Sequence, residues 1–208
     1  MGAPRAGRRG PSLLFEQRLW ARGLHWVAGT DEVGRGPLAG PVVAAAVVLP
    51  PDLPADLLAG CDDSKRLAPA AREQLVPRIQ EAALAWSVAE IPVAEIDALN
   101  IAQASFEAMR RALAALDPPP QHVLCDGVRN PRLPWAQTAL VGGDGLALSI
   151  AAASVLAKVH RDAHMRRLDA LYPGYGFATH KGYPTADHRA ALARLGPCAE
   201  HRRSFRLL

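Results

Sequence analysis

The sequence contains few cysteines and few aromatic residues, and its apolar runs are short. Its three cysteines, Cys61, Cys125 and Cys198, are widely spaced and form no Cys-x-x-Cys pair, which argues against a disulfide framework and against a structural zinc site. No apolar run reaches the roughly 18 residues of a membrane span, and no apolar segment of the signal-peptide type follows the N-terminal arginines. We therefore expect a cytoplasmic protein with no membrane partner.

Positive charge is concentrated at the two ends of the chain. Residues 1–12 contain three arginines and no acidic residue, and residues 151–208 contain ten Lys and Arg against four Asp and Glu. Between them, residues 13–150 contain 11 basic and 16 acidic residues. A basic C-terminal quarter beside an acidic body is typical of a protein that holds a polyanion next to clustered carboxylates.

The distribution of apolar residues predicts one α/β domain. The chain has 208 residues, half of them hydrophobic, which is enough to bury one core. Because strand-like and helix-like stretches interleave, we expect a mixed central sheet flanked by helices. Strands are expected at 24–28, 42–49, 84–91, 122–127 and 137–141. Helices are expected at 12–22, from 69, from an N-cap at Asn100, from an N-cap at Ser149 to 171, and at 186–195, with an irregular segment at 175–185.

The two ends of the chain are expected to differ from the body. Residues 1–12 have little to bury, so we expect a disordered basic N-terminal tail. Residues 13–208 should form the domain, including a small helical C-terminal extension at about 173–208.

Residues 29–41 combine two carboxylates, one cation and four glycines. An Asp-Glu pair before glycines is compatible with an ordinary solvated turn. A hairpin turn needs only one glycine, however, whereas Gly34 and Gly36 leave backbone N–H groups unshielded on both sides of Arg35. This arrangement suits the close approach of a polyanion or a sugar hydroxyl.

Three aspartates lie where carboxylates from separate elements could converge. Asp31 and Asp126 each close a short apolar strand, and ligands of α/β sheets gather outside strand ends. Asp162 shares a helical face with apolar residues, where an unpaired carboxylate is costly to desolvate. Without a histidine or cysteine cluster, such carboxylates form a hard oxygen site suited to Mg²⁺ or Mn²⁺. Beside lysines and arginines, this site predicts phosphodiester hydrolysis assisted by two ions about 3.5–4 Å apart.

Three assignments stay open from the residues alone. Adjacent strand residues face opposite sides, so Glu32 joins Asp31 either by its side chain at a strand end or bulge, or by its backbone carbonyl. Asp144 competes with Asp162, but it lies in a glycine loop, and we expect it to be a solvated loop residue. His180 either contacts phosphate or is structural, and the sequence favours neither role.

Five ordered blocks of the sequence resemble one known family. They are residues 29–46, Asp63-Ser64-Lys65, Cys125-Asp126-Gly127, residues 149–162, and residues 180–185 with the sequence His-Lys-Gly-Tyr-Pro-Thr. Together they resemble type 2 ribonuclease H, the bacterial ribonuclease HII family, over roughly residues 24–205.

The resemblance implies a ribonuclease H-like fold and an endonuclease that hydrolyses the RNA strand of RNA–DNA hybrids. It also implies cleavage 5′ of single ribonucleotides embedded in duplex DNA, giving 3′-hydroxyl and 5′-phosphate ends, and hence a role in removing ribonucleotides from DNA. The family's four acidic positions, which hold Mg²⁺ or Mn²⁺, fall on Asp31, Glu32, Asp126 and Asp162.

The resemblance also assigns substrate contacts. Gly34-Arg35-Gly36 matches the motif that reads the ribose 2′-hydroxyl, the group that distinguishes RNA from DNA. Tyr183 matches the tyrosine that stacks on the sugar at the RNA-to-DNA junction, and Lys65 and Lys181 match phosphate-contacting positions. We expect a monomer, and the sequence carries no clear motif for a sliding clamp.

Two other classes of protein fit parts of the sequence. Gly34-x-Gly36-x-x-x-Gly40 is superficially similar to a dinucleotide loop, but its third glycine is misplaced and a strand rather than a helix follows. A noncatalytic nucleic-acid-binding module explains the basic C-terminal quarter but not Asp162 on an apolar helical face. Soaking Mn²⁺ into crystals separates these classes, because only the nuclease needs ions among its aspartates.

Overall fold

A computed structural model describes residues 10–54 and 56–207 and contains one mixed sheet of five strands in the order β3-β2-β1-β4-β5. The pairs β1–β2 and β2–β3 are antiparallel, whereas β1–β4 and β4–β5 are parallel. The strands are β1 (Val27–Val33), β2 (Val42–Val48), β3 (Ala85–Ile91), β4 (His122–Asp126) and β5 (Gln137–Leu140). The predicted mixed sheet flanked by helices is therefore confirmed.

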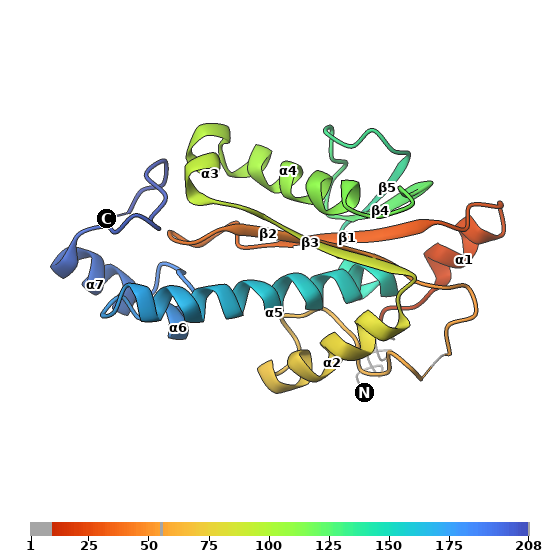
Figure 1. Ribbon diagram of the computed structural model, residues 1–208, viewed down its shortest axis with the longest axis horizontal. Coiled ribbons are helices and arrows are strands. Elements are labelled where there is room, and N and C mark those ends of the chain that lie inside the picture. The colour runs from red at the N-terminus through yellow and green to blue at the C-terminus, as the bar shows by residue number, and fades with distance from the viewer. Residues whose placement is uncertain (1–9, 55, 208) are drawn as a thin grey trace, which may run out of the picture.

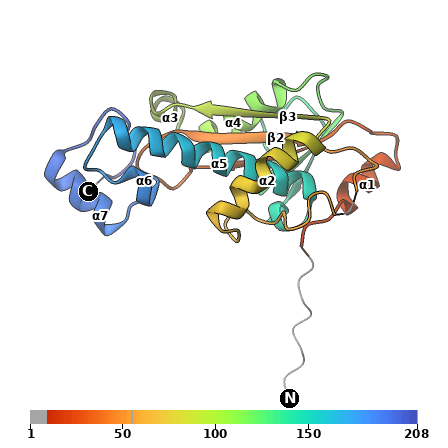
Figure 2. The same cartoon turned by 60° about the horizontal axis from the view of Figure 1, so that its bottom comes forward.

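The sheet is covered by helices on both faces (Figure 1). Helix α4 (Ile101–Ala114), with α3 (Val93–Leu99) before it, covers one face, while α5 (Leu148–Leu171) and α2 (Pro69–Ala82) cover the other, as Figure 2 also shows. Because helices cover both faces of the sheet, every residue of strand β2 is buried. Its alternate residues Val43 and Val47 pack with α5 and α2, and Val42 and Val48 pack with α4.

The N-termini of the two long helices are capped differently. The Asn100 side chain accepts hydrogen bonds from the backbone N–H groups of Ala102 and Gln103, which confirms the predicted cap of α4. The predicted cap at Ser149 is wrong, because α5 begins at Leu148. Glu16 replaces it: its carboxylate accepts from the Ser149 N–H at 2.9 Å and from the Ser149 hydroxyl at 2.6 Å. An acidic group near a helix N-terminus stabilises the helix through unpaired N–H groups.

Glu16 lies on α1 (Leu14–Trp20), at the end of the molecule where the described chain begins. Ser12, the last residue of the stretch predicted to be a disordered tail, forms an isolated parallel bridge with Ala147. Residues 1–9 of that predicted tail lie outside the described residues. The division into tail and domain therefore stays a prediction.

The C-terminal segment packs against the far end of α5 (Figures 1 and 2). It contains the one-turn helix α6 (Phe177–His180), inside the segment predicted to be irregular, and α7 (Ala186–Leu195). A small apolar cluster joins them to α5 and to the chain after β1, and its members are Leu38, Ala39, Met165, Leu168, Tyr175, Phe177, Ala191 and Leu192. Among the helices of the described residues, none has the length and apolar character needed to cross a bilayer.

Candidate metal centre and nucleic-acid interface

The acidic pair Asp31-Glu32 lies within a strand rather than after it. The sequence predicted a strand at 24–28, but β1 continues to Val33 because its partner β2 pairs with it along that whole length. In this register Asp31 faces Ala45 and Glu32 faces Ala44. Since strand neighbours alternate, Asp31 points toward the α5 face and Glu32 toward the α4 face. The strand is regular here and has no bulge, so the Asp31 and Glu32 side chains lie on opposite faces of the sheet.

Asp31, Asp126 and Asp144 converge. Asp126 ends β4 beside Asp31, because Thr30 pairs with Cys125 in parallel register. Asp144 lies in the short 3₁₀ helix η1 (Gly143–Gly145) just before α5, and the Gly143 N–H donates to Asp126 Oδ1 at 2.6 Å. One oxygen from each aspartate lies within 4.8 Å of the others, and this is the group of metal-binding type found among the described residues.

The expectation that Asp144 is a solvated loop residue is wrong, since the residue is 6% exposed. The loop prediction followed from its two flanking glycines. Gly142, with φ of 67°, instead lets the chain turn from β5 into η1, and a Cβ on Gly143 would lie 2.7 Å from Ile150 Cδ1. A Gly-Asp-Gly sequence between a strand and a long helix is the signal that could have identified this position.

Asp162, which the sequence analysis placed in the acidic site, lies elsewhere. Its carboxylate contacts Lys158 Nζ at 2.7 Å and Arg72 Nη2 at 3.6 Å. Ser154, which hydrogen-bonds Asp31, is eight residues earlier on α5, or about 12 Å along a helix axis. As its place on an apolar helical face predicted, this carboxylate has charged partners. The partners are two cations supplied by α2 and by the preceding helical turn.

The acidic cluster is electrostatically strained. Burial, followed by the charges of Glu32 and Asp126, raises the pKa of Asp31 well above its usual value. Burial also raises the pKa of Asp144 and of Glu32. Two cations approach: Lys65 Nζ lies 3.4 Å from Asp144, and Arg35 Nη1 lies 3.3 Å from Glu32. Buried carboxylate oxygens in excess of nearby cations fit a divalent hard metal ion such as Mg²⁺ or Mn²⁺.

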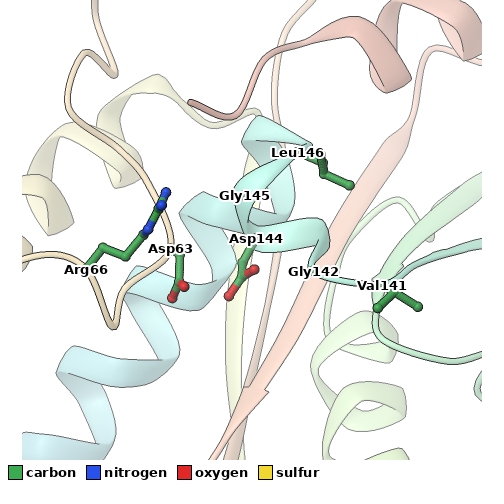
Figure 3. A pocket seen from close by; sticks show the side chains of 7 residues that line it. All are labelled: Asp63, Arg66, Val141, Gly142, Asp144, Gly145 and Leu146. Carbon is green, nitrogen blue, oxygen red and sulfur yellow. The ribbon is translucent and has the colours of Figure 1, made fainter. Parts of the chain in front are cut away.

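An open cavity borders Asp144. It is lined by Asp63, Arg66, Val141, Gly142, Asp144, Gly145 and Leu146. Figure 3 shows the carboxylates of Asp63 and Asp144 side by side along this cavity, and Lys65 Nζ lies between them, 3.8 Å from Asp63 and 3.4 Å from Asp144. The predicted phosphate-contacting Lys65 is therefore adjacent to the acidic cluster, and its side chain is 74% exposed.

The glycine-arginine-glycine motif lies in the turn after β1. Gly34 has φ of 97°, and a Cβ there would lie 2.4 Å from Arg161 Nε, so only glycine fits. The Arg35 side chain is 56% exposed and available to a ligand. A Cβ on Gly36 would lie 3.5 Å from the ring of Tyr183, which is 40% exposed. The predicted 2′-hydroxyl reader and the predicted junction tyrosine are thus neighbours, although about 150 residues separate them.

Two fully buried arginines hold this loop, and the sequence analysis missed both. Arg161 of α5 donates to the carbonyls of Pro41, Ala39 and Lys181 at 2.9–3.1 Å. Burial lowers its pKa only to about 10, so it is charged at neutral pH. Its position four residues before the apolar Met165, on a buried helical face, is the signal that could have marked it.

The second buried arginine is Arg202. It donates to the carbonyls of Gly34 at 2.6 Å, Arg35 at 3.1 Å and Gly40 at 2.8 Å. No sequence pattern marks it, because its partners are carbonyls about 160 residues away. The other predicted phosphate contact, Lys181, lies on the α6 side of the loop, where its Nζ donates to the Ala178 carbonyl.

Comparisons with known proteins agree with this geometry. A family model described as Ribonuclease HII matches residues 28–208. Ribonuclease HII of Moorella thermoacetica is 57% identical over 192 residues, which cover 92% of each chain. Ribonuclease H2 of Pyrococcus horikoshii has a TM-score of 0.70 at 26% identity, covering 87% of this chain and 94% of that one.

A second solved structure, the PCNA:RNase HII complex of Archaeoglobus fulgidus, gives a TM-score of 0.70 at 25% identity, with coverage of 85% of this chain and 92% of that one. The fold, the acidic cluster and the sequence similarity over nearly the whole chain point the same way. The chain belongs to the ribonuclease HII family and is a type 2 ribonuclease H.

Proposed function

We propose that this hydrolase of the RNA strand in RNA–DNA hybrids also cuts 5′ of single ribonucleotides embedded in duplex DNA, leaving 3′-hydroxyl and 5′-phosphate ends. The observation that carries the proposal is one continuous surface. The acidic cluster reaches the Gly34–Gly36 turn through the contact between Glu32 and Arg35, and the Tyr183 ring lies beside that turn, 3.5 Å from where a Cβ on Gly36 would be. A hydrolytic centre, a ribose reader and a stacking ring therefore lie in series.

The metal-binding residues in this proposal are Asp31, Glu32, Asp126 and Asp144. Asp144 takes the fourth acidic position in place of Asp162, because its oxygen lies within 4.8 Å of those of Asp31 and Asp126, while Asp162 is neutralised by Lys158 and Arg72. Two divalent ions, Mg²⁺ or Mn²⁺, would lower the pKa of an attacking water and stabilise charge on the scissile phosphate.

The chain's own residues bind and orient the substrate. Backbone groups of Gly34 and Gly36 reach the ribose 2′-hydroxyl because no Cβ blocks them. Tyr183, which is 40% exposed, offers its ring for stacking on the deoxyribose that follows the ribonucleotide. Lys65 and Lys181 contact backbone phosphates, with Lys65 also offsetting the charge of Asp144 at 3.4 Å. Asp162 fixes Arg72, whose guanidinium also donates to the Ser64 carbonyl at 2.7 Å and so supports the Lys65 loop.

The same proposal covers the cellular role and assembly state. All of the residues above come from a single chain, which is consistent with a monomer that removes ribonucleotides from DNA in the cytoplasm. The related archaeal enzyme was solved with PCNA, but no clear clamp motif supports such a partner here. Light scattering at micromolar concentration tests the monomer.

The deciding experiment compares Asp144→Asn with Asp162→Asn on a labelled duplex that contains one ribonucleotide. We expect Asp144→Asn to lose at least about a thousandfold in cleavage rate, as removal of a metal ligand would. Asp162→Asn should retain cleavage within about tenfold. An all-DNA duplex is the substrate control, and equal losses in the two variants would return Asp162 to the metal site.

A further inference from the structure

Three histidines and a cysteine form a cluster next to Tyr183, in which His188 and His201 are buried and His180 and Cys198 are half-buried. His188 of α7 and His201 of the C-terminal segment face each other, with 3.0 Å between their Nε2 atoms. His188 Nδ1 lies 2.9 Å from the Tyr183 carbonyl. His201 Nδ1 lies 3.0 Å from the Cys198 backbone nitrogen and 3.2 Å from Cys198 Sγ. Both rings are at most 1% exposed.

The hydrogen-bond partners determine which nitrogen of each ring carries the proton. A carbonyl can only accept, so His188 Nδ1 must carry the hydrogen that it donates to Tyr183. Its Nε2 is therefore an acceptor, and His201 Nε2 must be the donor between the rings. His201 Nδ1 is then left as an acceptor, and the Cys198 N–H donates to it. Each ring is neutral, each has one tautomer, and all four nitrogens are satisfied.

The same reasoning applies to His180 on α6. Its Nε2 lies 2.7 Å from the Tyr175 carbonyl and must donate, while its Nδ1 accepts from the Gly182 N–H at 3.1 Å. Its ring stacks on that of His188 at a centroid distance of 4.4 Å. His180 thus holds the residue before Tyr183 and supports the ring that holds Tyr183 itself. Of the two roles that the sequence left open for His180, these contacts favour the structural one.

This cluster fixes the backbone on which Tyr183 is carried. The Tyr183 N–H donates to the His180 carbonyl at 3.0 Å, and its own carbonyl accepts from His188 at 2.9 Å. The Gly182 carbonyl accepts from the Leu38 N–H at 2.8 Å, which ties the same turn to the loop that contains Gly36. Movement of His188 would therefore change the contact between the Tyr183 ring and Gly36.

We infer that His188 and His201 are positioning residues for ribonucleotide recognition, acting as a one-way hydrogen-bond chain from the Cys198 N–H to the Tyr183 carbonyl. The inference rests on the proposed function through the role of Tyr183. A second proton on His188 would occupy Nε2, the acceptor of the bond between the rings, and a second proton on His201 would occupy Nδ1, the acceptor of the Cys198 N–H bond. The chain is therefore intact only while both rings are neutral, and acid should weaken recognition of a single ribonucleotide before it weakens the rest of the fold.

The surroundings of the two rings keep them neutral. Burial, followed by the charge of His188, lowers the pKa of His201 to about 4. Burial also lowers the pKa of His188, although its bond to the Tyr183 carbonyl opposes this. The neighbouring groups that disfavour a further positive charge are His180 on α6, which stacks on His188, Arg189 on α7 and Arg203 in the C-terminal segment. Because the folded-state pKa values lie below the usual 6.5, stability from the neutral pair is complete above that value and is lost as pH falls toward 4.

The first test is independent of catalysis. Long-range ¹H–¹⁵N spectra of the full chain at pH 7.5 should show His188 protonated at Nδ1 and His201 at Nε2, each as one tautomer. A nuclear Overhauser contact should connect the Tyr183 ring to Gly36. The opposite tautomer at either ring would overturn the chain, whatever substrate the enzyme cuts.

The second test uses two substitutions at His188. His188→Asn places an amide donor where Nδ1 was, whereas His188→Phe keeps the ring size and donates nothing. We expect His188→Phe to lower the cleavage rate on a single embedded ribonucleotide about tenfold more than the rate on a long hybrid, and to lose the Tyr183–Gly36 contact. His188→Asn should recover most of both, and His25→Asn, at an exposed histidine far from the cluster, should change neither.

Each outcome of the second test decides the inference. Equal losses on both substrates, or a Tyr183–Gly36 contact that persists in His188→Phe, would overturn it. If His188→Phe fails to fold, the comparison of wild type with His188→Asn/His201→Gln decides. That double variant has no titrating ring at these two positions, so its ratio of the two cleavage rates should stay flat from pH 6.5 to 4, while the wild-type ratio falls as the pH approaches 4. A wild type that cuts hybrids but no embedded ribonucleotide refutes the proposed function instead and leaves the tautomer test standing.

Discussion

The acidic cluster and the histidine cluster are both buried groups of titratable side chains, yet they are built in opposite ways. In the acidic cluster, burial and mutual repulsion raise the pKa of Asp31 well above its usual value, and neighbouring cations offset only part of the charge. In the histidine cluster, each ring nitrogen of His188 and His201 has a hydrogen-bond partner and neither ring is charged. An unsatisfied group can bind a ligand strongly, while satisfied groups hold a fixed geometry.

The largest expected effect comes from replacing a carboxylate of the acidic cluster. Asp126→Asn should reduce Mg²⁺-dependent cleavage at least about a thousandfold while leaving binding to the duplex largely intact, because the proposed substrate contacts lie on the Gly34–Gly36 turn and Tyr183. Single-turnover rates and fluorescence anisotropy measure the two quantities. Retained turnover would contradict a metal-binding role for Asp126.

Arg161 is a second buried group whose hydrogen bonds are satisfied, and it can be tested by substitution. Replacing it by methionine removes the guanidinium donor from the carbonyls of Pro41, Ala39 and Lys181, of which Pro41 keeps a second donor in Arg202 at 3.3 Å; this should cost about 3–5 kcal/mol of unfolding free energy. Urea unfolding measures the change. Arg166→Met is the matched control on the same helix, because the Arg166 side chain is 49% exposed and pairs only at the surface with Glu73; its cost should stay below about 1 kcal/mol. Similar costs would mean that the buried guanidinium adds nothing.

A smaller effect is expected at Tyr183, which lies between the Gly34–Gly36 turn and the histidine cluster. Tyr183→Ala should lower cleavage of a single embedded ribonucleotide about tenfold more than cleavage of a long hybrid, because a ring that stacks on one sugar contributes roughly 1–3 kcal/mol. Tyr183→Phe keeps the ring and should behave as the wild type. Equal losses on the two substrates would remove Tyr183 from junction recognition.

The smallest expected effect is a gain in stability. Because folding raises the pKa of Asp31 above its usual 3.8, the fold is favoured with that carboxyl protonated, below about pH 3.8, and this contribution is lost as pH rises through the folded-state value. Asp31→Asn should therefore stabilise the metal-free protein at pH 8 by on the order of 1 kcal/mol, or about 2–4 °C in Tm. The gain should disappear at pH 3.5. Asp52→Asn, at an exposed aspartate, should change neither value, and a loss of stability in Asp31→Asn would contradict the repulsion.

Local sequence patterns identified much of the fold because they depend on neighbours along the chain. The apolar run of β2, the Asn100 cap and the helix at 186–195 each follow from a few adjacent residues. The length of β1 did not follow, since its second half is a strand only because β2 pairs with it. Ser149 was misread as a cap because the side chain that replaces it, Glu16, is 133 residues away.

The sequence by itself determined the family, the mixed sheet and the positions of Asp31, Glu32 and Asp126, because strand ends and glycine turns are local features. Only the tertiary structure places Asp144 beside Asp31 and Asp126, and Asp162 beside Arg72 and Lys158. A carboxylate on a buried face needs a positive partner, and no pattern along the chain reveals that Arg72 and Lys158 provide it for Asp162. The same holds for the turn of Gly34–Gly36 and the Tyr183 ring, whose contact depends on buried arginines and neutral histidines that meet only in the folded chain.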